Sequence, residues 1–283
     1  MKISIIIPSY NNLKYLIFTI NSIKKNSFFE HEIIIHVNEG SDGTLDYVKN
    51  NGLLFTFSKS NIGVCSSVNQ ASEKASTNYI FYSHDDMFYC KNWDVFLKEE
   101  LNKFNDNFYY LSGTTVSVNN GLINHDCGSS PDNFNEDRFN NFTKNDKSKD
   151  LQGSHWAPHL IHKELWIKIG GFSEEFNPGD GSDPDLCMKL WLNNVRVFKT
   201  ISKIKVYHFS SITTRKRNIS LNNGTRTFLL KYGFNPRFFR KYYLQGDGFN
   251  LYKGKLNQPK INFDMFHSLI VNKLKYFYFK IFS

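Results

Sequence analysis

The first 86 residues alternate between short apolar runs and stretches whose apolar residues fall at helical spacing. Runs of β-branched or aromatic residues with the length of a buried strand occupy residues 3–7, 32–37, 53–57 and 79–82. The stretches between them have the spacing of helices, at residues 13–23, 44–50 and 64–74. Strands that alternate with helices predict a doubly wound α/β fold, with a mostly parallel sheet and helices on both of its faces.

Polar residues follow three of these predicted strands. Tyr10 follows the first strand, residues 38–42 follow the second, and residues 84–86 follow the fourth. Because ligands of doubly wound sheets bind beyond the carboxyl ends of the strands, we expect these residues to surround a binding site.

Asp85 and Asp86 are the first candidates for chemistry. A carboxylate pair at a strand end can hold Mg²⁺ or Mn²⁺, although the same pair is also common in turns and helix caps. His208 ends a later predicted strand, where it can be a ligand or a structural residue. Residues 38–43 form a turn by composition, and their acids could accept hydrogen bonds from a nucleobase or ribose.

Asp180, Asp183 and Asp185 precede an apolar helix and form the second acidic group. An EF-hand calcium loop would need a glutamate at its twelfth position, where this chain has Trp191 or Asn194. The remaining interpretations are a catalytic base and a helix cap favoured by the helix dipole, and the two are compatible.

The second half of the chain has weaker periodicity. Residues 119–150 are rich in Asn, Asp, Lys and Gly, which predicts a long mobile loop or an insertion. Predicted helices follow at 163–169 and 186–193, predicted strands at 195–198 and 204–208, and a polar, basic loop at 210–224.

Composition narrows the classes of partner and compartment. The formal charge of +9 suggests an anionic partner, but no nucleic-acid motif is present, so we expect no nucleic acid to bind. The four cysteines are far apart in the sequence, which argues against a zinc site or a disulfide framework. Without a signal-peptide core or a membrane span, we expect a cytoplasmic protein.

The order of these pieces resembles the family 2 glycosyltransferases of the GT-A fold. In the first half the similar segments are IIIPSYN at 5–11, VNEGSDGT at 37–44, NIG at 61–63 with Asn69 downstream, and HDD at 84–86. In the second half they are GGFSEEF at 170–176, SDPDL at 182–186, YH at 207–208 and KYG at 231–233. The resemblance covers about residues 1–235, which divide into a nucleotide-sugar half, 1–118, and an acceptor half, 151–235.

The resemblance implies an inverting, metal-dependent transfer of a sugar from a nucleoside diphosphate, UDP above all, to a glycan or lipid-linked acceptor. It implies a role in polysaccharide biosynthesis and a divalent cofactor, Mn²⁺ or Mg²⁺. Asp183 would be the general base, and Asp86 and His208 would bind the metal. The nucleotide sugar would be bound by Pro8, Tyr10, Glu39, Asp42, Asn61 and Asp85. The acceptor side would include Trp156, with residues 153–155 beside it, and Asp185.

The chain departs from the family pattern at two places. The family usually has an aspartate where Asn38 or Glu39 stands, in a loop one residue longer, and it usually has a glutamate where Ser182 precedes Asp183.

Two other functions are open. A nucleotidyltransferase-like enzyme would need a Gly-rich, basic loop near the N-terminus, where residues 9–12 provide none. The other is a catalytically inactive module that binds a nucleotide or a carbohydrate. The presence of Asp86, Asp183 and His208 argues against it.

Residues 236–283 form a C-terminal extension that ends in an aromatic and basic segment. Phe266, Leu269, Ile270, Lys273, Leu274 and Phe277 could share one stripe of a helix. Such a helix could lie on an anionic membrane surface, at the inner face of the membrane, or it could pack on the domain with its lysines in water.

Overall fold

The computed structural model describes residues 1–209, 222–246 and 250–282. Its strands are β1 (Ser4–Tyr10), β2 (Glu32–Asn38), β3 (Leu54–Ser58), β4 (Tyr79–Tyr82), β5 (Met87–Tyr89), β6 (Tyr109–Ser117), β7 (Ile123–Asn124), β8 (Leu151–Gln152), β9 (His159–His162) and β10 (Val197–His208). Its helices are α1 (Leu13–Asn26), α2 (Thr44–Asn50), α3 (Val64–Ser72), α4 (Trp93–Leu101), α5 (Glu136–Asn145), α6 (Lys163–Ile169), η1 (Glu174–Phe176), α7 (Ser182–Leu192), α9 (Gly224–Tyr232), α10 (Pro236–Phe238), η2 (Phe239–Leu244) and α11 (Phe263–Ile281).

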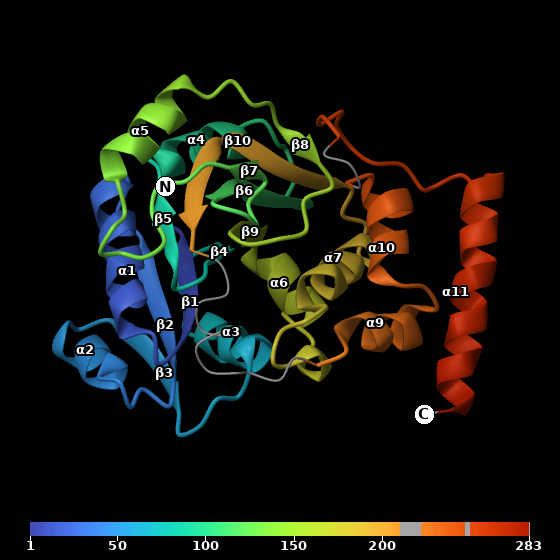
Figure 1. Cartoon of the computed structure of the whole chain (residues 1–283), viewed down its shortest axis with the longest axis horizontal. Helices are drawn as coiled ribbons and strands as arrows, with labels where there is room; N and C mark the ends of the chain where they lie inside the picture. The colour runs from blue at the N-terminus through green and yellow to red at the C-terminus, as the bar shows by residue number, and fades with distance from the viewer. Residues whose placement is uncertain (210–221, 247–249, 283) are drawn as a thin grey trace.

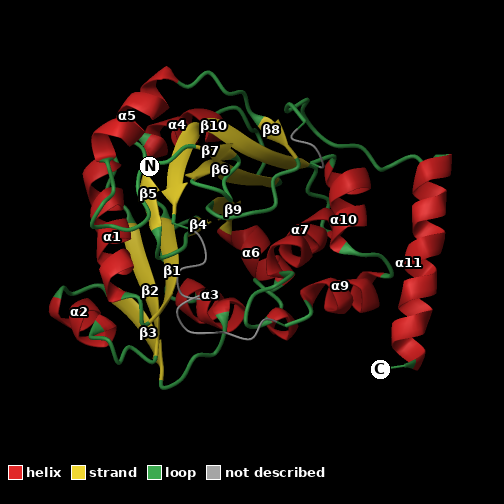
Figure 2. Cartoon of the chain, in the orientation of Figure 1, coloured by secondary structure: helices red, strands yellow, loops and turns green. Residues whose placement is uncertain are grey.

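The strands form a single sheet in the order β3-β2-β1-β4-β9-β6-β10-β5 (Figure 2). The four strands predicted in the first half, β1 to β4, are parallel neighbours. Beyond them the sheet is mixed, because β9 runs antiparallel to both β4 and β6 while β10 is parallel to β6. The predicted α/β fold is therefore confirmed, with a parallel half and a mixed half.

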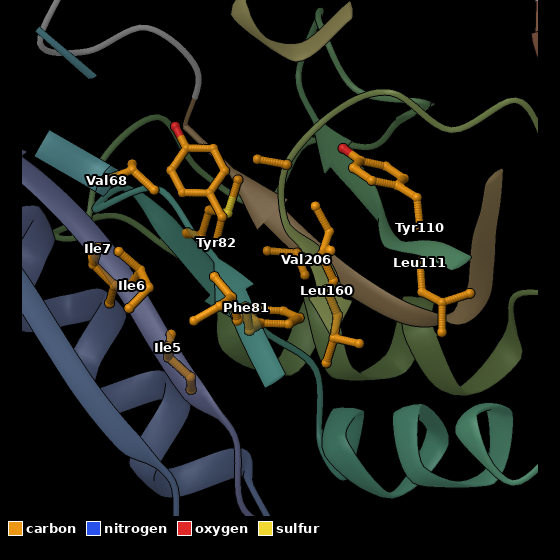
Figure 3. Packing of buried hydrophobic residues seen from close by; sticks show 14 of the residues in the cluster. Ile5, Ile6, Ile7, Val68, Phe81, Tyr82, Tyr110, Leu111, Leu160 and Val206 are labelled. Atoms are coloured by element: carbon orange, nitrogen blue, oxygen red, sulfur yellow. The ribbon is translucent and has the colours of Figure 1, made fainter. Parts of the chain in front are cut away.

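Helices cover both faces of the sheet (Figure 1). On one face, the end of α1 is tied to the start of α4 by the Asn92 N–H, which donates to the Asn26 carbonyl at 2.8 Å. On the other face, α6 is tied to α3, because the Trp166 indole N–H donates to the Ser72 hydroxyl at 3.0 Å. Ile5, Ile6 and Ile7 are consequently all buried, and Figure 3 shows them packed in the core around β4.

Of the two alternatives predicted for 119–150, the long mobile loop is wrong, because the segment contains β7 and α5. Asn135 caps α5 by accepting a hydrogen bond from the Arg138 N–H at 2.9 Å. Phe139 of this helix is fully buried and packs against Phe134 and Phe88. Aromatic side chains, and not aliphatic ones, pack this helix onto the domain. The loop was predicted because the segment has almost no periodic aliphatic residues.

Other boundaries also differ from the predictions. The two strands expected at 195–198 and 204–208 are one strand, β10, with a change of register between Ile201 and Lys205. Helix α7 begins at Ser182, four residues before its predicted start. No secondary structure was predicted for residues 87–118, which form β5, α4 and β6. Most of the predicted basic loop at 210–224 lies outside the described residues.

The C-terminal extension is packed on the main domain over part of its length. Tyr243 lies edge-on against Trp191 of α7, with ring centroids 5.3 Å apart, and the Leu256 N–H donates to the Arg196 carbonyl. Helix α11 stands at the edge of the molecule, beyond α9 and α10 (Figure 1). The predicted C-terminal helix is thus present, and it is the outermost element on that side.

Candidate active site

Three metal-binding side chains meet at the carboxyl end of the sheet. The ligand atoms of His84, Asp86 and His208 all lie within 4.8 Å of one another. His208 Nε2 is 3.1 Å from Asp86 Oδ1 and 3.2 Å from His84 Nδ1. The sequence predicted Asp86 and His208 as ligands but assigned no role to His84, although it opens the same HDD segment.

Strand pairing explains why these distant residues meet. His208 at the end of β10 is the partner of Met87 in β5, the residue that follows Asp86. The next residue along, Phe209, donates its N–H to the Asp86 carbonyl at 3.1 Å. The residue types then fit a divalent metal, because two imidazoles and one carboxylate are the ligands of many transition-metal sites.

The charges of the three side chains are consistent with a site for a cation. Burial and the nearby His208 lower the pKa of His84 to about 4, so its imidazole is neutral at pH 7, the form that binds metals. Burial alone would raise the pKa of Asp86 and lower that of His208, but their mutual attraction reverses both shifts. The attraction of Asp86 for positive charge at this place is what a site for a divalent cation requires.

Asp85 is held toward β1 and α1, on the other side of this cluster. Its carboxylate accepts hydrogen bonds from the Ser9 hydroxyl at 2.6 Å and from the Asn12 side chain at 3.1 Å. Burial, and then repulsion by Asp86, raise the pKa of Asp85 to about 7. Asp85 therefore links the end of β4 to the end of β1, two of the strand ends that were predicted to surround one site.

The predicted nucleoside-binding residues lie side by side at the ends of β1 and β2. Tyr10 is the strand partner of Asn38, next to Glu39, and Pro8 lies earlier in β1. Asp42, in the loop after β2, accepts a hydrogen bond from the Leu13 N–H at the start of α1, at 2.8 Å. Asp42 thus orders the loop against α1, a structural task that the sequence did not reveal.

Asn38, one of the two positions where an aspartate was expected, has a structural role. Its buried side chain donates to the Ser67 hydroxyl at 2.9 Å and accepts from the Ile62 N–H at 3.0 Å. An amide can do both at once, whereas a carboxylate can only accept. Asn38 therefore ties β2 to the loop before α3 and to α3 itself.

The NIG segment at 61–63 joins the two halves of the chain. The exposed Asn61 accepts a hydrogen bond from the Gly63 N–H, which shapes the turn before α3. Gly63 has a φ of +83°, and a Cβ there would lie 2.3 Å from the Asn177 side-chain oxygen. The same oxygen accepts a hydrogen bond from the Cys65 N–H at 3.0 Å, so the loop before α7 caps α3.

Asn69 fixes the GGF segment in the same way. Its side chain donates to the Phe172 carbonyl at 2.9 Å and accepts from the Phe172 N–H at 2.8 Å. The two halves of the resemblance are therefore bonded to one another through α3, which brings α7 to the carboxyl end of the sheet.

Asp183, in the first turn of α7, is the predicted base. Its Oδ1 is buried and has no hydrogen-bond partner among the described residues. Burial raises the pKa of Asp183 to about 7. Burial of the Tyr82 phenol, and then the charges of nearby groups that include Asp183, Asp85 and Asp86, raise the pKa of Tyr82.

Trp156, predicted on the acceptor side, lies in the loop before β9. Its carbonyl accepts a hydrogen bond from the Tyr110 hydroxyl at 3.0 Å, and its indole N–H donates to the Gly113 carbonyl at 3.3 Å. Burial of Tyr110, followed by the charges of Cys187 and Asp183, raises the pKa of that hydroxyl.

Asp185 differs from Asp183 because it is fully buried and has partners. Its Oδ1 is 2.8 Å from the Lys231 ammonium and accepts a hydrogen bond from the Tyr232 hydroxyl at 2.7 Å. Lys231 and Tyr232 belong to the KYG segment at 231–233, so this segment anchors α9 to α7.

We predict that Lys231→Met lowers the free energy of unfolding by about 3 kcal/mol, because it leaves the buried Asp185 carboxylate without its cation. Urea unfolding would measure the change. Lys241→Met is the matched control, because Lys241 forms an equally short but exposed pair with Asp264, and it should leave stability unchanged. Equal effects of the two substitutions would contradict a structural role for the Asp185 pair.

Comparison with protein families gives one match over most of the chain. A family model described as Glycosyl transferase family 2 matches residues 4–201, from β1 into β10. An uncharacterized glycosyltransferase of Rickettsia bellii (strain RML369-C) is 31% identical over 102 residues. These residues are 34% of this chain, and they span only 15% of that relative.

Comparison with solved structures shows the same fold at low identity. Residues 1–349 of TarS from S. aureus have a TM-score of 0.59 and 18% identity, over 98% of this chain and 80% of that one. The same protein in complex with UDP-GlcNAc has a TM-score of 0.54 over 75% and 61% of the two chains, at 18% identity. GalNAc-T7 with UDP, GalNAc and Mn²⁺ has a TM-score of 0.56 and 17% identity, over 79% of this chain and 44% of that one.

Proposed function

The chain belongs to glycosyl transferase family 2, with a GT-A fold, and on that premise we propose that it transfers a sugar from a nucleoside-diphosphate sugar to an acceptor hydroxyl. One observation carries the proposal: the side chains of His84, Asp86 and His208 meet at the carboxyl end of the sheet, and α7 carries a carboxylate with a raised pKa, Asp183, whose buried Oδ1 has no hydrogen-bond partner among the described residues. The cluster can hold a diphosphate through a cation, and the carboxylate can take a proton.

In the proposed reaction Asp183 is the general base. Its carboxylate takes the proton of the acceptor hydroxyl while that oxygen forms a bond to the anomeric carbon. The bond from that carbon to the diphosphate oxygen breaks, and the electron pair leaves with the nucleoside diphosphate. A single displacement of this kind inverts the anomeric configuration. A pKa of about 7 suits this role, because about half of the base is then ionised at neutral pH and the carboxylate is still basic enough to accept the proton.

We assign the divalent cation to His84, Asp86 and His208. When bound there, it offsets the negative charge that develops on the leaving diphosphate. Imidazole ligands suit Mn²⁺ better than Mg²⁺, which prefers oxygen ligands alone. We therefore propose Mn²⁺, and the Mn²⁺ in the GalNAc-T7 structure, which has the same fold, supports this choice.

The donor is proposed to be a UDP-sugar, held by the ends of β1 and β2. Solved structures with this fold contain UDP or UDP-GlcNAc, which supports the choice of nucleotide. Pro8, Tyr10, Glu39 and Asp42 would line the nucleoside side, with Asn61 at the entrance of α3 and Asp85 toward the ribose or sugar. Because Asn38 is already engaged with Ser67, we expect the uracil contact to come from Glu39 instead.

The acceptor is proposed to be a glycan or lipid-linked hydroxyl in polysaccharide biosynthesis, at the cytoplasmic face of a membrane. Trp156 would lie beside it. We assign Asp185 to the support of α7, because its carboxylate is occupied by Lys231 and Tyr232.

A screen of nucleotide sugars in Mn²⁺ tests the proposed function. The right donor at 100 times its Kd should raise the melting temperature by roughly 5 °C, since only the folded protein binds it. With an acceptor, NMR of the product should show the inverted anomeric configuration. Binding of a nucleotide sugar with no transfer and no hydrolysis would indicate an inactive binding module, and a retained configuration would rule out the single displacement.

A further inference from the structure

Helix α11 presents its apolar side outward. Among its residues only Met265 and Asn272 are buried, and the Asn272 side-chain oxygen accepts a hydrogen bond from the Asn235 N–H at 2.9 Å. The opposite face carries six large apolar side chains that are each between 45% and 86% exposed: Phe263, Phe266, Ile270, Leu274, Phe277 and Ile281. Successive spacings of three and four residues place them on one side of the helix.

This arrangement corrects the predicted stripe. Leu269 belongs to the inner side, where it is partly covered, and Lys273 lies at the edge of the outer face. A surface helix normally turns its apolar stripe toward the core and its charged residues toward water. An outward apolar face on the outermost helix of the molecule instead marks a surface that is covered by something else (Figure 1).

The charges beside this face are positive. Lys273, Lys275 and Lys280 flank it, and the single acid of the helix, Asp264, is paired with Lys241. Over residues 236–283 the sequence has nine Lys or Arg against two Asp, a net charge of +7 out of +9 for the whole chain. The excess charge of this protein is therefore concentrated in the segment that carries the apolar face.

We propose that α11 lies in the surface of an anionic lipid membrane, with its outward face in the acyl boundary and its lysines among the lipid phosphates. A second copy of this helix fits less well, because it would bring lysines against lysines with no acid to pair them. Within the described part of the chain, no helix is both long enough and apolar enough to span a bilayer. Insertion in the plane of the surface is the arrangement that uses both the apolar face and the flanking cations.

The neighbourhood of α11 supports an anionic occupant. A cavity of about 550 Å³ between α9 and α11 is lined by both Arg226 and Lys275. The Arg226 guanidinium also lies over the Phe279 ring of α11, 5.3 Å from its centroid. Two cations thus line the cavity beside α11 and add to the positive charge of this side of the molecule.

Helix α9, which lies beside α11, also contacts the loop that leads to the proposed base. Gly224, which opens α9, donates its N–H to Asp180 at 2.9 Å, three residues before Asp183. A Cβ on Gly224 would lie 2.0 Å from the Asp180 carbonyl oxygen, so α9 contacts this loop directly. Resting on the proposed function, this connection favours a lipid-linked acceptor that reaches Asp183 from the membrane surface.

Vesicle co-sedimentation tests the proposal with the full chain. We expect binding to vesicles with anionic phosphatidylserine, weakening in high salt, and no binding to phosphatidylcholine alone. The triple variant Lys273→Gln, Lys275→Gln, Lys280→Gln should bind roughly 10²-fold less tightly. Its matched control, Lys24→Gln, Lys49→Gln, Lys74→Gln, removes the same charge from exposed sites in or next to α1, α2 and α3 and should bind like the native protein.

The apolar face is tested in the same assay. Leu274→Gln, Phe277→Gln, Ile281→Gln should also bind roughly 10²-fold less tightly. The control Phe28→Gln, Ile167→Gln, Leu192→Gln removes equally exposed apolar residues from the main domain and should change nothing. Thermal unfolding and donor hydrolysis would show that all four variants are folded, and neither depends on vesicles.

Two results would overturn the proposal. One is a full-length chain that ignores anionic vesicles at low salt. The other is a chain that is dimeric in light scattering and becomes monomeric in the apolar variant, which would show that a second copy covers the face. Failure of the transferase proposal would leave vesicle binding in place, and failure of vesicle binding would leave transfer to a soluble acceptor, so the two can be told apart.

Discussion

Asp183→Asn is expected to lower kcat by roughly 10²–10⁴-fold, because the amide cannot take the proton of the acceptor hydroxyl. Donor binding should be little changed, since the residues proposed to bind the nucleotide lie at the ends of β1 and β2 and not on α7. Steady-state kinetics with a thermal-shift measurement of donor affinity would separate the two effects. Asp180→Asn is the matched control, because Asp180 is exposed in the same loop, and an asparagine can still accept the Gly224 N–H.

The pH dependence gives an independent check on the same residue. The proposed base must be ionised, so activity should fall as the pH drops below about 7. The free energy of unfolding should change in the opposite direction and should be higher at low pH. The folded-state pKa of about 7 lies above the unfolded value of about 3.9, so the contribution of Asp183 to stability is present at low pH and is lost as the pH rises from about 4 to about 7.

Because an asparagine does not ionise, Asp183→Asn should not lose stability as the pH rises. The variant should be at least as stable as the native protein above pH 7. A folded variant with near-native kcat would contradict the assignment, as would a large loss of kcat in Asp180→Asn. The combination of lost activity and unreduced stability is the expected signature of a group whose burial serves catalysis.

The parallel half of the sheet could be predicted from the sequence because its strands are buried on both faces. Continuous β-branched runs such as residues 5–7 then stand out against the helices between them. The mixed half lacks this signal. The sequence of β6 is YYLSGTTVS, in which Ser112 and Thr114 are buried polar residues with hydrogen-bond partners from distant segments. Partners that far away in the chain leave no local pattern.

The candidate site shows the same division. Asp86, Asp183 and His208 could be proposed from the sequence because each follows or ends a strand or opens a helix within a recognisable segment. His84 was missed because nothing in the sequence shows that β10 returns beside β5 and brings His208 within reach of its ring. The structural tasks of Asp42 and Asp185 were missed for a related reason. Their partners, Leu13 and Lys231, are 29 and 46 residues away, and only the fold brings them together.

Asp86→Ala is expected to abolish Mn²⁺ binding and to lower kcat by roughly 10³-fold, since a metal of this kind contributes several kcal/mol to the stabilisation of developing charge. Titration of Mn²⁺ by calorimetry or electron paramagnetic resonance measures the loss of the metal without reference to activity. Asp46→Ala, which removes an exposed acid on α2, is the control and should bind Mn²⁺ like the native protein. Full activity of the native protein in excess EDTA would contradict the metal proposal and would move attention to Arg215, Lys216 and Arg217, which lie outside the described residues.

The choice of metal can be tested at the ligand that the sequence missed. His84 contributes an imidazole to a site that otherwise has one imidazole and one carboxylate. His84→Asp changes the set to two carboxylates and one imidazole, which is closer to what Mg²⁺ prefers. We expect the ratio of kcat/KM in Mg²⁺ to that in Mn²⁺ to rise by roughly tenfold, with weaker Mn²⁺ binding in the same titration. If the ratio and the Mn²⁺ affinity both stay unchanged, His84 is a neighbour of the site and not a ligand, and Asp86 and His208 must bind the cation with the donor diphosphate alone.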